Sequence, residues 1–161
     1  MTDPATPSQL AANNMAATEE AGADVSPPDS AAIMGLTGLL SEIDALIESY
    51  DGLQSTGGIA ADWADLHRAH REALSGLLVS LGAQPEPVGV NLVAKGGVTL
   101  RATMAGDDAA LAALLQRENR LLDRYAEVAD ALADPDQRAT LQAQRAALVD
   151  LANRTQDMLD G

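Results

Sequence analysis

The sequence predicts an all-α four-helix bundle, and three observations lead to this prediction. Apolar residues recur every three or four positions in four segments of about 20 residues, as they do along the buried face of an amphipathic helix. Hydrophobic residues make up 47% of the 161 residues, which is enough for one core formed by about 100 to 130 residues. Proline, glycine and aspartate stand at the ends of the segments. Four such helices bury their apolar faces best against one another.

The N-terminal region differs from the rest in composition. Residues 1–29 are rich in Ala, Pro, Ser and Thr, and they hold five acidic residues and no Lys or Arg. With few large apolar side chains, this region cannot bury enough surface to offset the entropy lost on ordering. We expect a disordered acidic tail at residues 1–29 and a bundle domain at residues 30–161.

The first two helices are predicted over residues 29–52 and 59–82. Asp29 or Ser30 is the expected N-cap of the first helix, and Gly82 is the expected C-cap of the second. The inward residues of the first helix are Leu36, Leu40, Ile43, Ile47 and Tyr50. Those of the second are Ile59, Trp63, Leu66, His70, Ala73, Leu77 and Leu81, with Trp63 as a core residue or, alternatively, an interface anchor.

The last two helices are separated by Asp134 and Pro135. Asp107 or Asp108 is the expected N-cap of the third helix, and Asp136 is the expected start of the fourth. The inward residues of the third helix are Leu111, Leu114, Glu118, Leu121, Tyr125, Val128 and Leu132. Those of the fourth are Leu141, Gln144, Leu148, Leu151, Thr155 and Met158.

The connection between the second and third helices, residues 83–106, fits two patterns. Apolar residues alternate on both sides of residues 95–97, as in a β-hairpin. The spacing of Val93, Leu100 and Met104 also fits one face of a short helix. Because an isolated hairpin is marginally stable, we favour a long crossover with a short helix.

Three stretches match one known family in order and spacing. They are residues 77–85 with a Leu-Gly-x-x-Pro ending, residues 99–108 with Gly-Asp-Asp, and Glu118 followed seven residues later by Tyr125. Through them the chain resembles the bacterial ferritin-like group known as domain of unknown function 2383. The resemblance covers residues 33–132 and implies a ferritin-like four-helix bundle. It implies no activity, because that family is uncharacterised.

Charge and composition exclude several classes of function. The net charge is −14, and the chain carries 11 acidic residues before its first basic residue, Arg68. This charge argues against nucleic acid and membrane surfaces as partners, because both favour basic patches. The absence of Cys excludes disulfides and thiolate chemistry. The sequence shows no secretory signal, so we expect a cytoplasmic protein.

The residues needed for a ferritin-like di-iron centre are missing. Such a centre takes a carboxylate from each of two helices and a Glu-x-x-His motif from each of the other two. The two histidines, His67 and His70, follow Ala64 and His67 by three positions, so neither belongs to that motif. A weaker alternative is an atypical iron or zinc site made by His67, His70, Glu118 and Asp44.

Glu118 is the unusual polar residue of the predicted core. A buried carboxylate without a partner costs several kcal/mol, so it needs hydrogen-bond donors. We predict a structural network of Glu118 with Tyr50, His70 and Tyr125, and no catalytic residue or cofactor. His67 is expected on the solvated flank of its helix.

Two groups of arginines flank the predicted helices. Arg68 and Arg71, and the group Arg117, Arg120 and Arg124, are expected to form solvated ion pairs with nearby acids, which are Glu72, Asp123 and Glu127. Alternatively, they form a docking surface for a second copy or for the acidic first helix.

The favoured function is that of a non-enzymatic ferritin-like bundle that acts through protein contacts, as a homodimer and with an unknown protein partner. One alternative is the atypical metal-binding protein described above. Another is a helical chaperone or adaptor with an exposed apolar groove.

Overall fold

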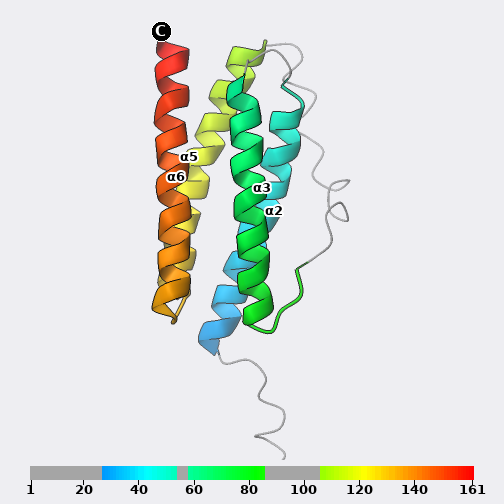
Figure 1. The fold of residues 1–161 in the computed structure, drawn as a ribbon, viewed down its shortest axis with the longest axis vertical. Coiled ribbons are helices and arrows are strands. Elements are labelled where there is room, and N and C mark those ends of the chain that lie inside the picture. The colour runs from blue at the N-terminus through cyan, green and yellow to red at the C-terminus, as the bar shows by residue number, and fades with distance from the viewer. Residues whose placement is uncertain (1–26, 54–57, 86–105) are drawn as a thin grey trace, which may run out of the picture.

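Four long helices make up the part of the chain that the structure describes (Figure 1). Their bounds are Pro27–Asp51 for α2, Gly58–Ser80 for α3, Asp107–Ala131 for α5 and Pro135–Asp160 for α6. The structure is a computed structural model, and it describes residues 27–53, 58–85 and 106–161. All regular structure in these ranges is α-helical, so the predicted all-α four-helix bundle is confirmed.

Two predictions fall outside the described residues. The disordered tail is predicted for residues 1–29, of which residues 1–26 are not described, and its predicted end at residue 29 is wrong because residues 27–29 belong to α2. The choice between a hairpin and a short helix concerns residues 86–105, which are also not described. Both remain predictions.

The helices form a bundle with one long return connection. α2 packs against α3 and α5, and α6 packs against α5 and α3. α3 ends at one end of the bundle and α5 begins at the other, so these two helices run in the same direction (Figure 1). The end of α3 and the start of α5 therefore lie at opposite ends of the bundle, whereas α5 and α6 are antiparallel and joined by residues 132–134.

The helix starts differ from the predictions by one or two residues. α2 begins at Pro27 rather than Asp29, because proline is tolerated in the first helical turn. The N-cap of α5 is Gly106, with φ of 83°, rather than an aspartate. α6 begins at Pro135, and its N-cap Asp134 accepts hydrogen bonds from the backbone N–H of Asp136 at 2.7 Å and of Gln137 at 3.2 Å.

The buried face of α3 is rotated from the predicted one. The predicted inward residues of the other three helices are largely buried, although Met158 is 45% exposed. On α3, Leu66 and Leu77 are only half-buried and Ala73 is exposed. Trp63 and His70 are buried as predicted, and the other buried residues of α3 are Ala60, Ala64, His67, Leu74 and Leu78. The apolar periodicity of α3 is compatible with both the predicted and the observed buried face, and packing against α2 selects the observed one.

Residues 29–51 of α2 are long and apolar enough to cross a membrane by length and composition, with a mean hydropathy of 1.4. Core helices of soluble bundles share these properties. In this bundle the fully buried apolar residues of α2 face α3 and α5, and they include Leu36, Leu39, Ile43 and Leu46. Core packing therefore accounts for part of the apolar composition of α2, since 33% of the apolar window is buried.

Gly35 lets α2 approach α5 closely. A Cβ atom at this position would lie 2.7 Å from Cγ2 of Val128, and valine is too stiff to move aside easily. Gly76 of α3 has no atom within 4 Å of the corresponding position. The two glycines form a matched pair, since both are helical and only one lies at a helix contact.

We predict opposite effects for Gly35→Ala and Gly76→Ala. Gly76→Ala gains helix propensity and should raise the free energy of unfolding by about 0.5–1 kcal/mol. Gly35→Ala gains the same propensity, but overpacking against Val128 costs about 1–3 kcal/mol, so the variant should be less stable than Gly76→Ala. Chemical denaturation of both variants measures this difference. Equal stabilisation by the two substitutions would show that α2 and α5 are not closely packed at Gly35.

Candidate functional site

A cluster of polar and aromatic side chains lies inside the bundle, and we call it the polar centre. It consists of Tyr50 of α2, His67 and His70 of α3, and Glu118 and Tyr125 of α5. Each is at most 7% exposed, and both His67 and Glu118 are fully buried. The helical spacing of three or four residues puts the two histidines on the inward face of α3.

One carboxylate oxygen of Glu118 joins three helices. The Tyr50 hydroxyl donates to Glu118 Oε1 at 2.9 Å, and His67 Nε2 lies 2.8 Å from the same oxygen. Since this oxygen accepts from Tyr50, we place a proton on His67 Nε2, which then also donates to it. The donors that Glu118 was predicted to need come from α2 and α3, and both act on Oε1.

The partner histidine differs from the predicted one. The sequence predicts His67 in solvent, but this residue is fully buried, because the inward face of α3 passes through it. His70 instead packs edge-on against Tyr125, with ring centroids 6.3 Å apart. No hydrogen bond of His70 or Tyr125 to Glu118 is present among the described residues, so the predicted network is wrong in these two members.

An aromatic stack supports the polar centre from α3. Trp63 stacks on Tyr50 with centroids 5.5 Å apart and an interplanar angle of 2°, and on His67 at 5.7 Å and 24°. The indole N–H of Trp63 donates to Thr155 Oγ1 of α6 at 2.9 Å. Trp63 is fully buried, in agreement with its prediction as a core residue. This bond connects α6 to the same layer.

Burial sets the protonation of the phenols and of His70. Desolvation, followed by the nearby Glu118 carboxylate, raises the pKa of Tyr50 and of Tyr125 far above the ordinary phenol value. Both hydroxyls therefore stay protonated, and the hydroxyl of Tyr50 donates to Glu118. Burial, and then the neighbouring His67, lowers the pKa of His70 to about 4.

The polar centre does not bring a metal-ligand set together. No group of three His, Asp or Glu side chains with metal-binding geometry occurs in the described ranges. His67 and Glu118 contact each other, and His70 faces Tyr125. Asp44 lies apart from them, in an ion pair with Arg71 at 2.5 Å. The four weak candidates from the sequence therefore do not form one site.

Several polar atoms of the polar centre have no partner within the described residues. They are His67 Nδ1, His70 Nδ1, Glu118 Oε2 and the Tyr125 hydroxyl. The side chains that carry these atoms are buried, so the atoms are shielded from solvent. The arrangement supplies hydrogen bonds across helices and no accessible nucleophile or base.

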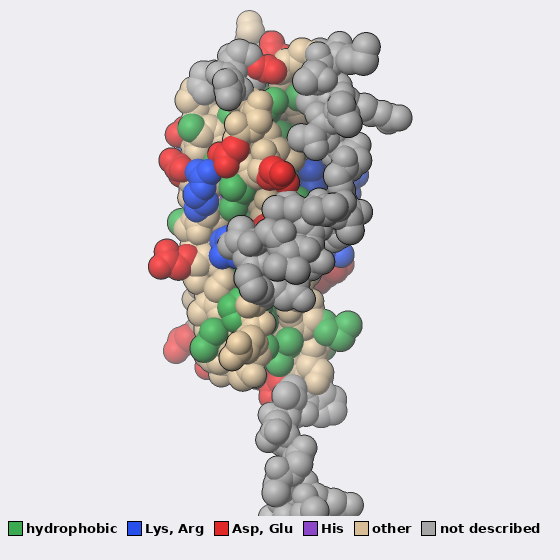
Figure 2. Space-filling model, turned by 90° about the vertical axis from the view of Figure 1, so that its right-hand side faces the viewer, with side chains coloured by type: hydrophobic (Ala, Val, Ile, Leu, Met, Phe, Trp, Pro, Cys, Tyr) green, Lys and Arg blue, Asp and Glu red, His purple; other side chains and the backbone are tan. Residues whose placement is uncertain are grey.

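Three of the five arginines pair with α2 rather than with the predicted acids, and Arg68 also pairs with Asp65 of its own helix at 2.9 Å. Arg124 of α5 binds Glu42 at 3.1 Å, Arg68 of α3 binds Asp51 at 2.7 Å, and Arg71 of α3 binds Asp44. No ion pair in the described part of the chain uses the predicted partners, which are Glu72, Asp123 and Glu127. The sequence analysis gave, as an alternative, that the arginines bind the acidic first helix. The three ion pairs agree with this alternative, and they form within one chain. Figure 2 shows acidic and basic side chains close together on one face.

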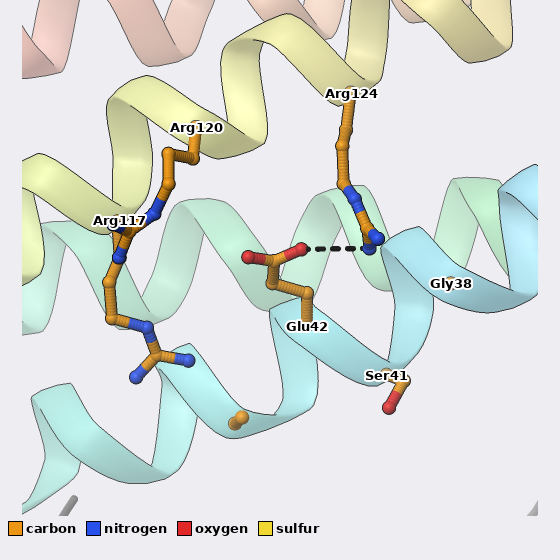
Figure 3. A pocket seen from close by; sticks show the side chains of 7 residues that line it. Gly38, Ser41, Glu42, Arg117, Arg120 and Arg124 are labelled. Atoms are coloured by element: carbon orange, nitrogen blue, oxygen red, sulfur yellow. Dashed lines mark hydrogen bonds and ion pairs between the residues drawn. The ribbon is translucent and has the colours of Figure 1, made fainter.

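A hollow of about 560 Å³ lies between α2 and α5, and we call it the arginine hollow. Its lining residues are Gly38, Ser41, Glu42, Ala45, Arg117, Arg120 and Arg124. Figure 3 shows the three arginine side chains reaching from α5 toward α2. The sequence analysis did not predict this hollow. The signals in the sequence were the small residues of α2 and the three arginines of α5, and only the structure shows that they face each other.

Comparisons with known proteins establish the fold and nothing more. No protein-family model matches the sequence, and no curated protein matches it. The chain is similar to the crystal structure of a conserved hypothetical protein, rv2844, from Mycobacterium tuberculosis. The sequence identity is 19%, the TM-score is 0.67, and the match covers 80% of this chain and 97% of that one. The shared feature is the helical bundle. Membership in the ferritin-like group stays a prediction.

We predict that Glu118 matters for stability through its two donors. Glu118→Ala leaves Tyr50 and His67 buried without an acceptor and opens a cavity, so it should cost about 3–5 kcal/mol. Glu118→Gln keeps the volume and one acceptor oxygen, so we expect a smaller loss of about 1–2 kcal/mol. Urea unfolding of both variants measures the two losses. Equal losses would contradict an essential role of the acceptor.

We predict an acid-sensitive contribution from His70. Histidine in the unfolded chain titrates near its ordinary pKa of 6.5, whereas folded His70 titrates with a pKa of about 4. Between these values the unfolded state binds the extra proton, so stability falls as the pH drops from 6.5 to 4. Over this window the wild type should lose on the order of 2 kcal/mol more than His70→Gln. Parallel pH dependences of the two proteins would refute this contribution.

Proposed function

We propose that this chain is a non-enzymatic ferritin-like bundle that acts through contacts with other proteins. The main support is that Glu118 Oε1 is engaged by Tyr50 and His67 inside a closed core. Through these contacts, the polar groups at the centre of the bundle hold the helices together. The single long connection between α3 and α5 fits the topology of ferritin-like folds. We expect the protein in the cytoplasm.

We further infer a homodimer that forms through one end of the bundle. Met34 of α2 is 76% exposed and Val79 of α3 is 61% exposed. Both lie toward the end where α2 begins and α3 finishes, and hydrophobic side chains gather at that end in Figure 2. Exposed apolar side chains that gather in one region favour a protein contact.

We predict that the full chain sediments as a dimer of about twice its 16.6 kDa mass. Met34→Glu combined with Val79→Glu should shift it to the monomer, because the charges would be buried in the contact. Met158→Glu, near the other end, is the matched control and should remain dimeric. A wild-type monomer at all concentrations, or equal effects of both changes, would rule out this contact and favour a different protein partner.

The alternative function is that of an atypical metal-binding bundle with His67, His70 and Glu118 as ligands, although these residues do not form a group of three metal ligands within the described ranges. The observation that favours it is the lack of a protein partner for Glu118 Oε2 and for Nδ1 of each histidine within the described residues. Elemental analysis of full-length protein from iron- and zinc-supplemented cells separates the two functions. Stoichiometric metal that is lost in His67→Ala would support the metal site, and metal-free protein would support the structural role.

Co-purification of one protein would support the chaperone or adaptor alternative.

A further inference from the structure

Three arginines line the arginine hollow because of their spacing on α5. Arg117, Arg120 and Arg124 follow one another at intervals of three and four residues, which places them on one face of the helix. Arg124 pairs with Glu42 of α2 at 3.1 Å, whereas Arg117 and Arg120 have no carboxylate partner within the described ranges. In Figure 3, Arg117 and Arg120 lie to the left of the Glu42 carboxylate and Arg124 lies to its right.

The lining of the arginine hollow carries a net positive charge. It includes three guanidinium groups, and Glu42 is the one acidic side chain among the residues that line it. The lining therefore has a net charge of +2, in a chain whose net charge is −14. Because a guanidinium group stays protonated at physiological pH, this positive charge does not titrate. An anion with two negative charges would neutralise it.

A phosphate monoester matches the chemistry of this lining. Its phosphoryl group carries a charge of about −1.5 to −2 at pH 7, and its oxygens fit the planar N–H donors of a guanidinium group. A carboxylate has one charge and would balance half of the excess. A nucleic acid presents phosphates in a long row, but the net charge of −14 opposes a long polyanion. The lining therefore favours one phosphoryl group on a small molecule.

The size of the arginine hollow leaves room for the organic part of such a molecule. Its volume of about 560 Å³ lies within the range of about 300–1,000 Å³ that is usual for small-molecule sites. Gly38 and Ala45 of α2 have no side-chain atoms beyond Cβ, so they keep this space free. A Cβ atom at Gly38 would lie 3.6 Å from Nη1 of Arg124, so this glycine borders the charged part of the hollow.

We propose that the arginine hollow binds a small-molecule phosphate monoester. Arg117 and Arg120 donate hydrogen bonds to the phosphoryl oxygens, and the organic part lies beside Gly38 and Ala45. Arg124 stays paired with Glu42, which keeps the excess charge at two. This inference is independent of the proposed function, because it concerns a ligand between two helices of one chain and not a contact with another protein.

Calorimetric titration of the full chain with phenyl phosphate tests the proposal. Benzoate is the matched ligand, since it has the same ring and one negative charge. We expect one phenyl phosphate per chain, bound about tenfold more tightly than benzoate at equal ionic strength. Its affinity should fall between pH 7 and pH 5, because the phosphoryl group loses its second charge with a pKa of about 6.

Substitutions in the lining locate the binding site. Arg117→Gln combined with Arg120→Gln removes the two guanidinium groups that lack a carboxylate and should weaken phenyl phosphate binding by about tenfold or more. Arg154→Gln is the matched control and should leave the affinity unchanged, because Arg154 is an exposed residue of α6 outside the lining. Arg120→Gln alone, at an exposed position, keeps the test valid if the double variant does not fold.

Gly38→Leu tests the space rather than the charge. Leucine at this position fills part of the hollow and leaves every charge in place, so it should also weaken phenyl phosphate binding. Its higher helix propensity favours folding of α2. Circular dichroism of each variant checks that the helices are intact.

Three results would overturn the proposal. The first is no binding of phenyl phosphate to the wild type up to about 10 mM. The second is equal affinity for benzoate, which would show that the site does not select a doubly charged group. The third is binding that neither Gly38→Leu nor the arginine substitutions weaken, which would place the ligand elsewhere on the protein.

Discussion

The buried carboxylate of Glu118 is the constraint on which the arrangement of the helices depends. A fully buried carboxylate is tolerated only with donors close to it, and here they come from α2 and α3. Tyr50 and His67 reach the same oxygen, so the rotation of both helices about their axes is fixed relative to α5. Trp63 continues this layer to α6 through Thr155. One polar layer thus ties all four helices together.

The same layer explains why the interior offers little chemistry. Tyr50, Trp63 and His67 stack on one another and keep Glu118 away from water. Burial holds the phenols in their protonated form and lowers the pKa of His70 to about 4, so these groups favour their neutral states. A closed centre whose phenols and His70 are neutral serves packing specificity better than substrate binding. The surfaces of the bundle are therefore the more informative places for function.

The charged side chains on those surfaces fall into two groups, which are the residues in ion pairs and the arginines that have no carboxylate partner within the described residues. The acidic side chains of α2 hold arginines of α3 and α5 through exposed or half-exposed pairs, each worth about 0–1 kcal/mol. These pairs orient the helices only weakly compared with the core. On the α5 side, two further arginines are left over beside small residues of α2, which allow the hollow to form. Close helix approach at Gly35 belongs to the same face of α2.

The sequence by itself determined the four helices, their approximate ends and the inward position of Glu118. Periods of three and four residues, and the break at Asp134 and Pro135, are local properties that survive in any packing. Only the tertiary structure decided which histidine meets Glu118. His67 and His70 are three residues apart on one helix, and the apolar pattern of α3 fits two faces that differ by a small rotation. The choice came from Tyr50 and Glu118 on other helices, which a single helix cannot reveal.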